Sequence, residues 1–481
     1  MPTILGANTL STGYEVENSL RFDDGSSAFL SKTFSGDGTS HDIGTVSFWI
    51  KRCELSAEQG IFTAGSSNRH FIRFESNNTF TFRAVTDSFH LNTNQIFRET
   101  SGWYHFVIAY DTTQGTGSNR VKIYVNGVQL TSFATADYPD QNLDIKLGAA
   151  EANHIGNDAE QTNPYYDGYM AEFVYIDGQQ LAPTSFGEFD EDSPNIWKPI
   201  DVSGLTFGTN GFYLEFKQTG TSANSSGMGA DTSGNDNHFG TSGLASTDVT
   251  EDTCTNNFAV LNPLTIPSGS SLTLSEGNLD VNGNSTDVGA KATLGVSAGK
   301  WYWEIKAVSA SSGSDRMLVA TENVRQITSA TDENSQGIWG IQSRSGSGAT
   351  LNSFTNGTFS NGNSGSTGFN DNTIIGVALD ADNGKLYFHK DGTYTDLSGN
   401  TGNPVNGTNP TFTGLPTDGT FLFPYVENRL NGTPSSQVNF GGAPSFSISS
   451  GNSDANGYGN FEYTVPSGYY ALNSKNLAEY G

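Results

Sequence analysis

Residues 299–306 read GKWYWEIK, and residues 374–392 read IIGVALDADNGKLYFHKDG. In the first stretch, large apolar side chains at odd-numbered positions alternate with more polar ones, which is the period of a half-buried β-strand. In the second, two apolar runs meet at Asn383-Gly384, and another turn follows at Asp391-Gly392. Both dipeptides supply the positive φ angles that two-residue hairpins need. This part of the chain is therefore predicted to be an antiparallel meander.

The length and composition of the chain predict an all-β protein with two domains. A chain of 481 residues is too long for a single hydrophobic core. It contains 57 glycines, and Ser, Thr and Asn are dense between the apolar runs, whereas helix-forming stretches are nearly absent. We expect two antiparallel, jelly-roll-like β-sandwiches joined by a turn-rich connector.

The same alternation recurs in the first half of the chain. Residues 46–50 and 104–110 alternate with a period of two, and another apolar run covers residues 169–176. A hairpin turn is predicted at Asn126-Gly127. Strands at this spacing, each with an apolar and a polar face, predict two stacked sheets.

Ordered motifs in this half resemble a known family. NSLRFDDGSSAFLSK, TVSFWIKR, WYHFVIAYD, RVKIYVNGVQL and YYDGYMAEFVYIDGQQL resemble a laminin-G-like domain of the concanavalin A-like lectin superfamily. The resemblance covers residues 18–185. It implies a sandwich that often places calcium and carbohydrate at its rim loops.

The second half resembles a different family. GKWYWEIK, GVALDADNGKLYFHKDG, FLFPYV and VNFGG occur in the order of a SPRY domain, and we place this domain at residues 266–481. The resemblance implies a β-sandwich that binds partners and has no catalytic machinery of its own.

Residues 186–265 form the predicted connector, with a few short strands. Its motifs, including GEFDEDSPNIWKP, DTSGNDNHF and TNNFAVLNPL, resemble a linker of large tailed-bacteriophage virion proteins, chiefly tail fibres. The resemblance implies a virion protein that contacts other virion proteins and forms a homo-oligomer, as a trimer in most phage fibres. Residues 1–17 are polar and turn-rich, and are either an arm that docks on the virion or a frayed terminus.

Charge and patterning exclude several partners. Fifty acidic and 23 basic residues give a formal net charge of −27, so we expect no nucleic-acid partner. No apolar run approaches membrane-spanning length, and the start of the sequence lacks the pattern of a cleaved signal. We therefore expect a protein made in the host cytoplasm and located in the virion, without membrane insertion. Cys53 and Cys254 are predicted to be buried thiols, because two cysteines so far apart make no disulfide framework.

Concanavalin A-like folds include glycosidases, which use paired carboxylates. Glu188, Asp190 and Asp192 would share one face of an extended strand, as paired carboxylates require. However, prolines bracket the segment and no apolar strand residues flank it, so a solvated acidic loop is favoured. The seven histidines are scattered and form no metal or catalytic motif. We expect no enzymatic activity.

Two oxygen-rich segments are weak candidates for a metal site. Residues 380–384 begin like a calcium loop but lack the distal glutamate, so a hairpin turn is favoured there. Residues 231–237 are compatible with an Asx turn or with a weak ion site.

The best candidate for a ligand site is the loop at residues 156–167. Asn157, Asp158 and Asp167 offer oxygen ligands, and Asp158 and Asp167 are the predicted ligands if Ca²⁺ binds. Tyr165 and Tyr166 offer flat faces suited to sugars. The alternative is that these tyrosines pack beneath the loop.

Three functions are compatible with these predictions. The first is a tail-fibre or tail-tip adhesin that presents both sandwiches to a host-surface glycan or protein. The second is a structural virion protein, such as a head fibre or capsid decoration. The third is a polysaccharide depolymerase, which would require a convergent carboxylate pair that the sequence does not reveal.

Overall fold

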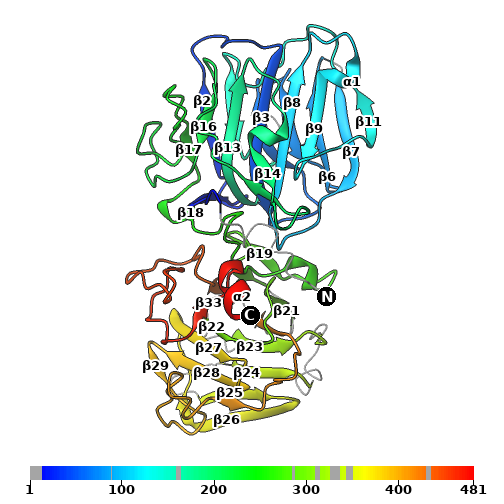
Figure 1. Cartoon of the computed structure of the whole chain (residues 1–481). Coiled ribbons are helices and arrows are strands. Elements are labelled where there is room, and N and C mark those ends of the chain that lie inside the picture. Colours follow the sequence, from blue (N-terminus) through cyan, green and yellow to red (C-terminus); the bar gives the residue numbers. More distant parts are fainter. Residues whose placement is uncertain are drawn as a thin grey trace. The chain divides into compact units, whose positions relative to one another are not determined.

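The computed structural model describes residues 13–87, 89–158, 164–283, 288–308, 315–324, 336–342, 350–428 and 435–481. The chain divides into two compact units, Met1–Asn257 and Phe258–Gly481. Both are built almost entirely of β-strands, so the predicted fold class, two antiparallel β-sandwiches, is confirmed (Figure 1).

The first unit contains two large antiparallel sheets. One has the order β10 (Val128–Gln129), β9 (Val121–Val125), β8 (Tyr104–Asp111), β3 (Ile43–Arg52), β13 (Gly168–Asp177), β1 (Ser19–Phe22) and β18 (Val249–Thr250), and β16 (Phe212–Leu214) also pairs with β13. The other has the order β11 (Phe133–Asp137), β7 (His90–Ile96), β6 (Thr79–Ala84), β5 (His70–Phe74), β4 (Gln59–Ala64), β12 (Ala152–Ile155), β2 (Phe29–Thr33) and β17 (Gly240–Ser242). The remaining elements of this unit are a two-stranded sheet, β14 (Gly187–Phe189) with β15 (Trp197–Pro199), and the short helices α1 (Gly117–Arg120), η1 (Pro183–Ser185) and η2 (Ser246–Asp248).

Aromatic side chains fill the space between these two sheets. The ring of Phe48, on the central strand β3, stacks on Phe106 at 5.7 Å and on Phe173 at 5.3 Å between ring centroids. From the opposite sheet, Phe62 meets Phe173 edge-on, and Phe80 stacks on Phe106 at 4.3 Å. Each buried phenylalanine stabilises the folded unit by about 1.5–3 kcal/mol through loss of apolar surface to water.

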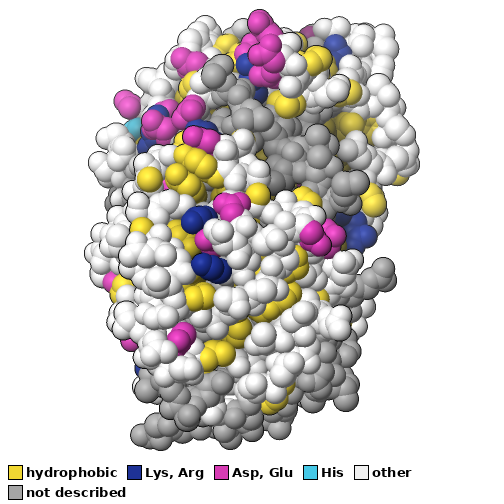
Figure 2. Space-filling model, turned by 60° about the horizontal axis from the view of Figure 1, so that its bottom comes forward, with side chains coloured by type: hydrophobic (Ala, Val, Ile, Leu, Met, Phe, Trp, Pro, Cys, Tyr) yellow, Lys and Arg dark blue, Asp and Glu magenta, His cyan; other side chains and the backbone are white. Residues whose placement is uncertain are grey.

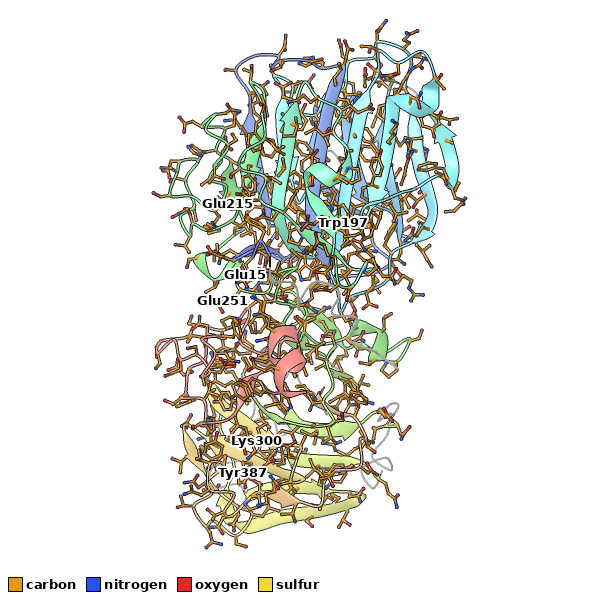
Figure 3. All side chains as sticks on the ribbon, in the orientation of Figure 1. Glu15, Trp197, Glu215, Glu251, Lys300 and Tyr387 are labelled. Atoms are coloured by element: carbon orange, nitrogen blue, oxygen red, sulfur yellow. The ribbon has the colours of Figure 1, made fainter. Side chains whose placement is uncertain are left out.

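The predicted connector differs from a linker, because most of it belongs to the first unit. Strands β16, β17 and β18 extend the two sheets, and the division of the chain falls at Asn257. Trp197, on β15, covers the outer face of the β3–β8 region and donates a hydrogen bond from Nε1 to Nδ1 of His105 at 2.9 Å (Figure 3). The turn at Gly127 (φ 78°) lies directly under this indole, where any side chain would collide with it. The outer face of this sheet, which the alternation predicts to be polar, is thus buried beneath the β15 segment.

A buried ion pair also attaches the connector to the sandwich. Lys51 Nζ lies 2.7 Å from Asp252 Oδ2, with side-chain exposures of 0% and 1%. The same ammonium group donates to Asn257 Oδ1 at 2.8 Å. The sequence pattern places Lys51 on the solvent face of β3, but the side chain is buried. The Asp252 carboxylate, from far along the chain, offsets the free-energy cost of burying the ammonium group.

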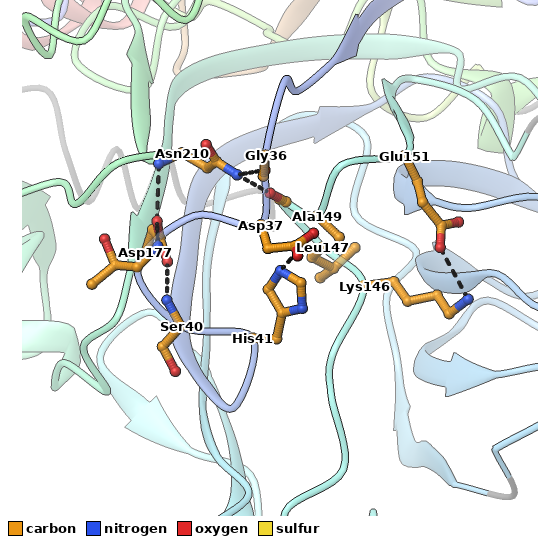
Figure 4. Close-up of polar contacts among 12 residues, drawn as sticks. Gly36, Asp37, Ser40, His41, Lys146, Leu147, Ala149, Glu151, Asp177 and Asn210 are labelled. Carbon is orange, nitrogen blue, oxygen red and sulfur yellow. Dashed lines mark hydrogen bonds and ion pairs between the residues drawn. The ribbon is translucent and has the colours of Figure 1, made fainter.

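One end of the first sandwich is organised by Asp177, the last residue of β13 (Figure 4). Its carboxylate accepts backbone N–H groups of Thr39 at 2.6 Å, Ser40 at 3.0 Å and Asn210 at 2.9 Å. The Asn210 side-chain amide in turn donates to the carbonyls of Gly36 and Gly148. Three loops therefore depend on one buried carboxylate and one buried amide.

The second unit contains the other sandwich. Its larger sheet has the order β19 (Thr273–Ser275), β20 (Asp280–Asn282), β32 (Ser435–Asn439), β22 (Lys300–Ala307), β27 (Thr373–Asp380), β28 (Lys385–Lys390) and β29 (Thr393–Tyr394), with β30 (Phe412–Thr413) on β28 and β33 (Tyr470–Ala471) on β22. The smaller sheet has the order β21 (Val288–Lys291), β31 (Leu422–Asn428), β23 (Asp315–Thr321), β24 (Ile338–Gln342), β25 (Thr350–Thr355) and β26 (Thr358–Thr367). Two helices complete the unit, η3 (Pro263–Thr265) and α2 (Ser474–Tyr480). Among the described residues, no helix is long and apolar enough to cross a membrane.

Strand β22, which contains the sequence WYWEI, is buried on both faces, so the prediction of a half-buried strand is wrong. Glu304 is fully buried and accepts backbone N–H groups from Glu462 at 2.9 Å and Tyr463 at 2.8 Å. The Tyr302 hydroxyl donates to Glu304 at 2.9 Å. The polar side chains of this face are therefore satisfied by a late segment of the chain that covers it.

Of the two turns predicted in this unit, one is a two-residue hairpin. Asp391 (φ 48°) and Gly392 (φ 82°) connect β28 and β29, as predicted. The β27–β28 connection instead has four residues, 381–384, and only Gly384 has a positive φ angle among them. The prediction of a two-residue turn at Asn383-Gly384 is wrong, because the Asp380 carboxylate caps a wider turn by accepting from the backbone and side chain of Asn383.

The predicted N-terminal arm is described from Gly13 onward, and residues 1–12 lie outside the described part of the chain. Tyr14 donates its hydroxyl to Glu172 at 3.3 Å, and the backbone N–H of Val16 donates to Thr255 Oγ1 at 3.1 Å. The described end of the arm therefore packs on the first unit.

Candidate functional site

The rim opposite Asp177 brings together loops from three strands of the first sandwich. Phe22, at the end of β1, is paired with Gly168, at the start of β13, and Gly168 is also paired with Arg52, at the end of β3. This antiparallel register places the residues that follow β1 and β3 beside those that precede β13. Of the loop at residues 156–167, favoured from sequence, residues 159–163 lie outside the described residues, and residues 164–167 reach this rim just before β13.

Three carboxylates converge at this rim. Oxygen atoms of Asp23, Asp24 and Asp167 all lie within 4.8 Å of one another, with Asp23 and Asp167 buried and Asp24 exposed. Burial, and then the negative charge of Asp24, raise the pKa of the neighbouring Glu54. Clustered carboxylate oxygens are the donor set that Ca²⁺ prefers, so these residues fit the ion that the lectin-like resemblance implies.

Asp158 does not belong to this set, and its predicted role as a metal ligand is wrong. It is fully buried, with Oδ1 2.5 Å from Arg69 Nε and Oδ2 3.6 Å from Arg73 Nη1. Two guanidinium groups thus neutralise the carboxylate that the sequence assigned to an ion. Both arginines come from the β4–β5 region, which the loop's own sequence does not reveal.

The two tyrosines of the loop have different environments. Tyr166 is fully buried and donates its hydroxyl to the carbonyl of Lys51 at 2.6 Å, so it cannot stack on a sugar and the packing alternative holds for it. Tyr165 is half-buried, with its ring 6.2 Å from that of Phe29. The side chain of Asn157 is buried, and its carbonyl oxygen accepts no hydrogen bond from the described residues.

The structure therefore retains Asp167 and Tyr165 as ligand-facing candidates and adds Asp23 and Asp24. The sequence analysis missed this pair, although it lies in FDDGSS, directly after strand β1. A DDG sequence that closes a strand is the signal that could have identified it. Its pairing with Asp167 depends on a strand register that spans most of the domain.

The other metal candidates are turns. Asp231 accepts the backbone N–H groups of Tyr213, Ser233 and Asn237 at 2.8–2.9 Å and the hydroxyl of Ser233, which is an Asx-turn arrangement. In the segment 380–384, Asp380 forms an ion pair with Lys300 at 3.2 Å in addition to its contacts with Asn383. These carboxylates are occupied by protein donors.

A buried Ser–His pair in the first unit has the composition of a catalytic dyad. Ser47 Oγ lies 2.9 Å from Nε2 of His105. Because the Trp197 indole N–H donates to Nδ1, the neutral imidazole carries its proton on Nε2 and donates it to Ser47. Burial lowers the pKa of His105 to about 3, so the ring stays neutral. A general base would need Nε2 free to accept the serine proton, and this tautomer cannot do so.

The acidic segment at residues 188–192 is partly neutralised. Lys198 Nζ lies 3.3 Å from both Glu188 and Asp190. Asp190 also accepts the backbone N–H groups of Asp192 and Ser193. On the face shown in Figure 2, acidic and basic side chains are interspersed.

Comparison with protein families identifies both sandwiches. Residues 23–182 match the Laminin_G_3 model, described as the concanavalin A-like lectin/glucanases superfamily, and residues 300–443 match the SPRY domain model. The chain thus contains a lectin-like domain and a SPRY domain. The phage resemblance of the connector stays a prediction, since neither match bears on it. Comparison with curated protein sequences finds no match.

Several solved structures show similarity to part of the chain. The TRIM65 PSpry domain is 17% identical, with 38% of this chain and 92% of that chain covered and a TM-score of 0.28. The SPRY domain of human HERC1 is 18% identical, with coverages of 37% and 96% and a TM-score of 0.27. A putative carbohydrate binding protein from Bacteroides ovatus ATCC 8483 is 16% identical, with coverages of 48% and 58% and a TM-score of 0.31.

Proposed function

We propose that this chain is a non-enzymatic adhesin of a bacteriophage virion, in a tail fibre or tail tip, which binds a host-surface glycan or protein. The observation that carries the proposal is the pairing of a lectin-like domain with a SPRY domain in one chain. The virion location rests on the resemblance of residues 186–265 to phage linkers, which also implies a homo-oligomer, a trimer as in most phage fibres, and contacts with other virion proteins.

The absence of enzymatic activity is supported by the chemistry of the candidate groups. The Ser47–His105 pair has the wrong tautomer for a general base, and Lys198 pairs with Glu188 and Asp190. A depolymerase would need two convergent, unneutralised carboxylates beside a sugar-binding cleft.

The proposed binding surface is the rim that carries Asp23, Asp24, Asp167 and Tyr165. The three carboxylates would hold Ca²⁺, and the ion would supply coordination to sugar hydroxyls. Tyr165 would supply a partly exposed ring for the apolar face of a sugar.

The test is binding of the fluorescently labelled full chain to candidate host cells, in calcium and then in chelator. We expect saturable binding that falls in chelator. Asp24→Asn should weaken binding, because it removes a carboxylate from the cluster without disturbing a buried group. Asp192→Asn is the matched control, because Asp192 is an exposed acidic residue in the same unit and is not part of the cluster.

The outcomes separate the remaining alternatives. Binding that is insensitive to chelator and to Asp24→Asn would remove calcium from the proposal and leave the adhesin role. Absence of binding across host strains, with the native oligomer, would contradict the adhesin role and favour a structural head-fibre or capsid-decoration protein. New reducing ends in host polysaccharide would indicate a depolymerase.

A further inference from the structure

The second unit contains a pocket between its two sheets, at the end of the sandwich where β28 turns into β29. Its volume is about 290 Å³. Strands β24 and β25 supply one wall and strands β27 and β28 supply the other. We call it the inter-sheet pocket. It lies in a different unit from the rim that carries Asp23, Asp24 and Asp167, so its chemistry is independent of the proposed adhesin role.

Much of the buried lining of the inter-sheet pocket is apolar. Five of its lining side chains are hydrophobic, and each is less than 9% exposed: Ile341, Leu351, Phe369, Ile375 and Phe388. Sandwich interiors are normally filled by side chains from both sheets, so a space of this size is unusual. It equals the volume of about ten water molecules, at about 30 Å³ each. Water gains few hydrogen bonds against such walls, whereas an apolar group gains dispersion contacts and loses its exposure to water.

The polar lining selects the kind of ligand. Lys390 and Asp391 are adjacent at the β28–β29 turn, so their opposite charges largely cancel. The Lys390 ammonium also donates to the Gly368 carbonyl at 3.0 Å. Thr393 and Thr395 belong to the lining, and neither hydroxyl is hydrogen-bonded within the described residues.

These features disfavour charged ligands. An anion would meet Asp391 and the field of a chain with a formal net charge of −27. A cation would meet Lys390 and would lose its hydration against the apolar walls. A neutral hydroxyl or amide can instead exchange hydrogen bonds with the threonine hydroxyls.

We propose that the inter-sheet pocket binds a neutral aromatic group of about ten non-hydrogen atoms that carries one hydroxyl or amide. The ring lies among the five hydrophobic side chains, and the polar end faces Thr393 and Thr395. Such a group has two sources, a free small molecule or an aromatic side chain of a bound polypeptide. Probes of matched ring size distinguish them.

The experiment is a titration of the full chain, labelled with ¹³C at isoleucine methyl groups, followed by NMR. Ile341 and Ile375 report on opposite walls of the pocket. The probes are 2-phenylethanol, its charged counterparts phenylacetate and 2-phenylethylammonium, and N-acetyl-L-phenylalaninamide for the polypeptide source. We expect 2-phenylethanol to shift both methyl signals with a dissociation constant on the order of a millimolar, as suits so small a ligand.

The charged probes should bind at least about tenfold more weakly, because burying an unpaired charge is unfavourable. Binding of N-acetyl-L-phenylalaninamide at the same methyl groups would identify a polypeptide side chain as the source. Its failure beside successful binding of 2-phenylethanol would identify a free molecule. Unshifted Ile341 and Ile375 signals, or equal binding of neutral and charged probes, would overturn the proposal.

A pair of variants tests the location. Leu351→Trp fills the pocket and should weaken binding of 2-phenylethanol at least about tenfold, because the added ring occupies the same volume. Leu264→Trp is the matched control, because Leu264 is 49% exposed in the same unit and lies outside the pocket. Equal affinity in both variants would place the probe elsewhere and contradict the proposal. The wild-type titration decides the question even if Leu351→Trp does not fold.

Discussion

Removing the carboxylate of Asp252 should destabilise the first unit by about 3 kcal/mol. Its partner Lys51 has a fully buried ammonium group at 2.7 Å, and Asp252→Ala would leave that charge without its counter-ion. Breaking a buried pair in this way costs about 3–5 kcal/mol. We place the expected cost at the lower end, about 3 kcal/mol, because Asn257 still accepts from the ammonium group at 2.8 Å.

The measurement is guanidinium chloride unfolding of the full chain, resolved by domain. A two-domain chain need not unfold in one step, so each unit needs its own probe. The six tryptophans are divided equally, with Trp49, Trp103 and Trp197 in the first unit and the other three in the second. Fluorine-labelled tryptophan therefore reports each transition separately by NMR.

For a slope of about 5 kcal/mol per molar, a loss of about 3 kcal/mol lowers the midpoint of the first unit by about 0.6 M. The signals from the second unit serve as the internal control. The double variant Lys51→Met/Asp252→Leu should recover most of the loss, because replacing both partners of a buried pair by apolar groups is often close to neutral. A midpoint shift below about 0.2 M for Asp252→Ala would refute the claim that this segment is an integral part of the first domain.

Four further predictions concern the first unit. A fragment of residues 1–257 should unfold in a cooperative transition, whereas a fragment of residues 1–185 should not, because the shorter chain exposes the outer face of its sheet. Calorimetry of both fragments checks this. Burial raises the pKa of Glu172 from 4.5 to about 7. The stabilisation of the folded unit by protonation of Glu172 is therefore fully present below pH 4.5 and is lost as the pH rises through 7. Glu172→Gln should remove up to about 3 kcal/mol of this pH dependence of the unfolding free energy. Because burial lowers the pKa of His105 to about 3, its ring signals should stay constant in NMR spectra from about pH 8 to about pH 5. Asp177→Ala should lower the free energy of unfolding by about 2–4 kcal/mol and speed hydrogen exchange of the three backbone amides that donate to the Asp177 carboxylate. Unchanged hydrogen exchange would contradict the role of Asp177.

Local patterns predicted the strands and several turns of this chain. Alternation located the central strands of both sandwiches, and the Asn126-Gly127 turn has φ angles of 48° and 78°, as a type I′ hairpin requires. These features depend on residues close together in the sequence. The same alternation could not show what covers the polar face of each strand. His105 and Glu304 look solvent-facing by position, but segments far along the chain bury them and satisfy their hydrogen bonds.

The candidate site was predictable only in part, for the same reason. Asp167 was identified because it lies in a loop rich in oxygen ligands. Asp23 and Asp24 join it through strand register, and Asp158 leaves it because Arg69, from a different hairpin, pairs with it. Residue type indicates what a side chain can bind, whereas the partner that it actually contacts depends on the tertiary fold.

The first and the last described strand of the first unit lie side by side, which has a consequence for how such a domain spreads among proteins. Strand β1 pairs with strand β18, and Val16 is hydrogen-bonded to Thr255 just outside them. A unit whose chain enters and leaves at one place can be spliced into a surface loop of a host protein without stretching either partner. Recombination between genes could therefore transfer this domain as a cassette, provided that the breakpoints lie outside β1 and β18 and not at the end of the lectin-like motif. A shorter transfer would carry the recognisable sequence and leave behind the segment that covers its outer face.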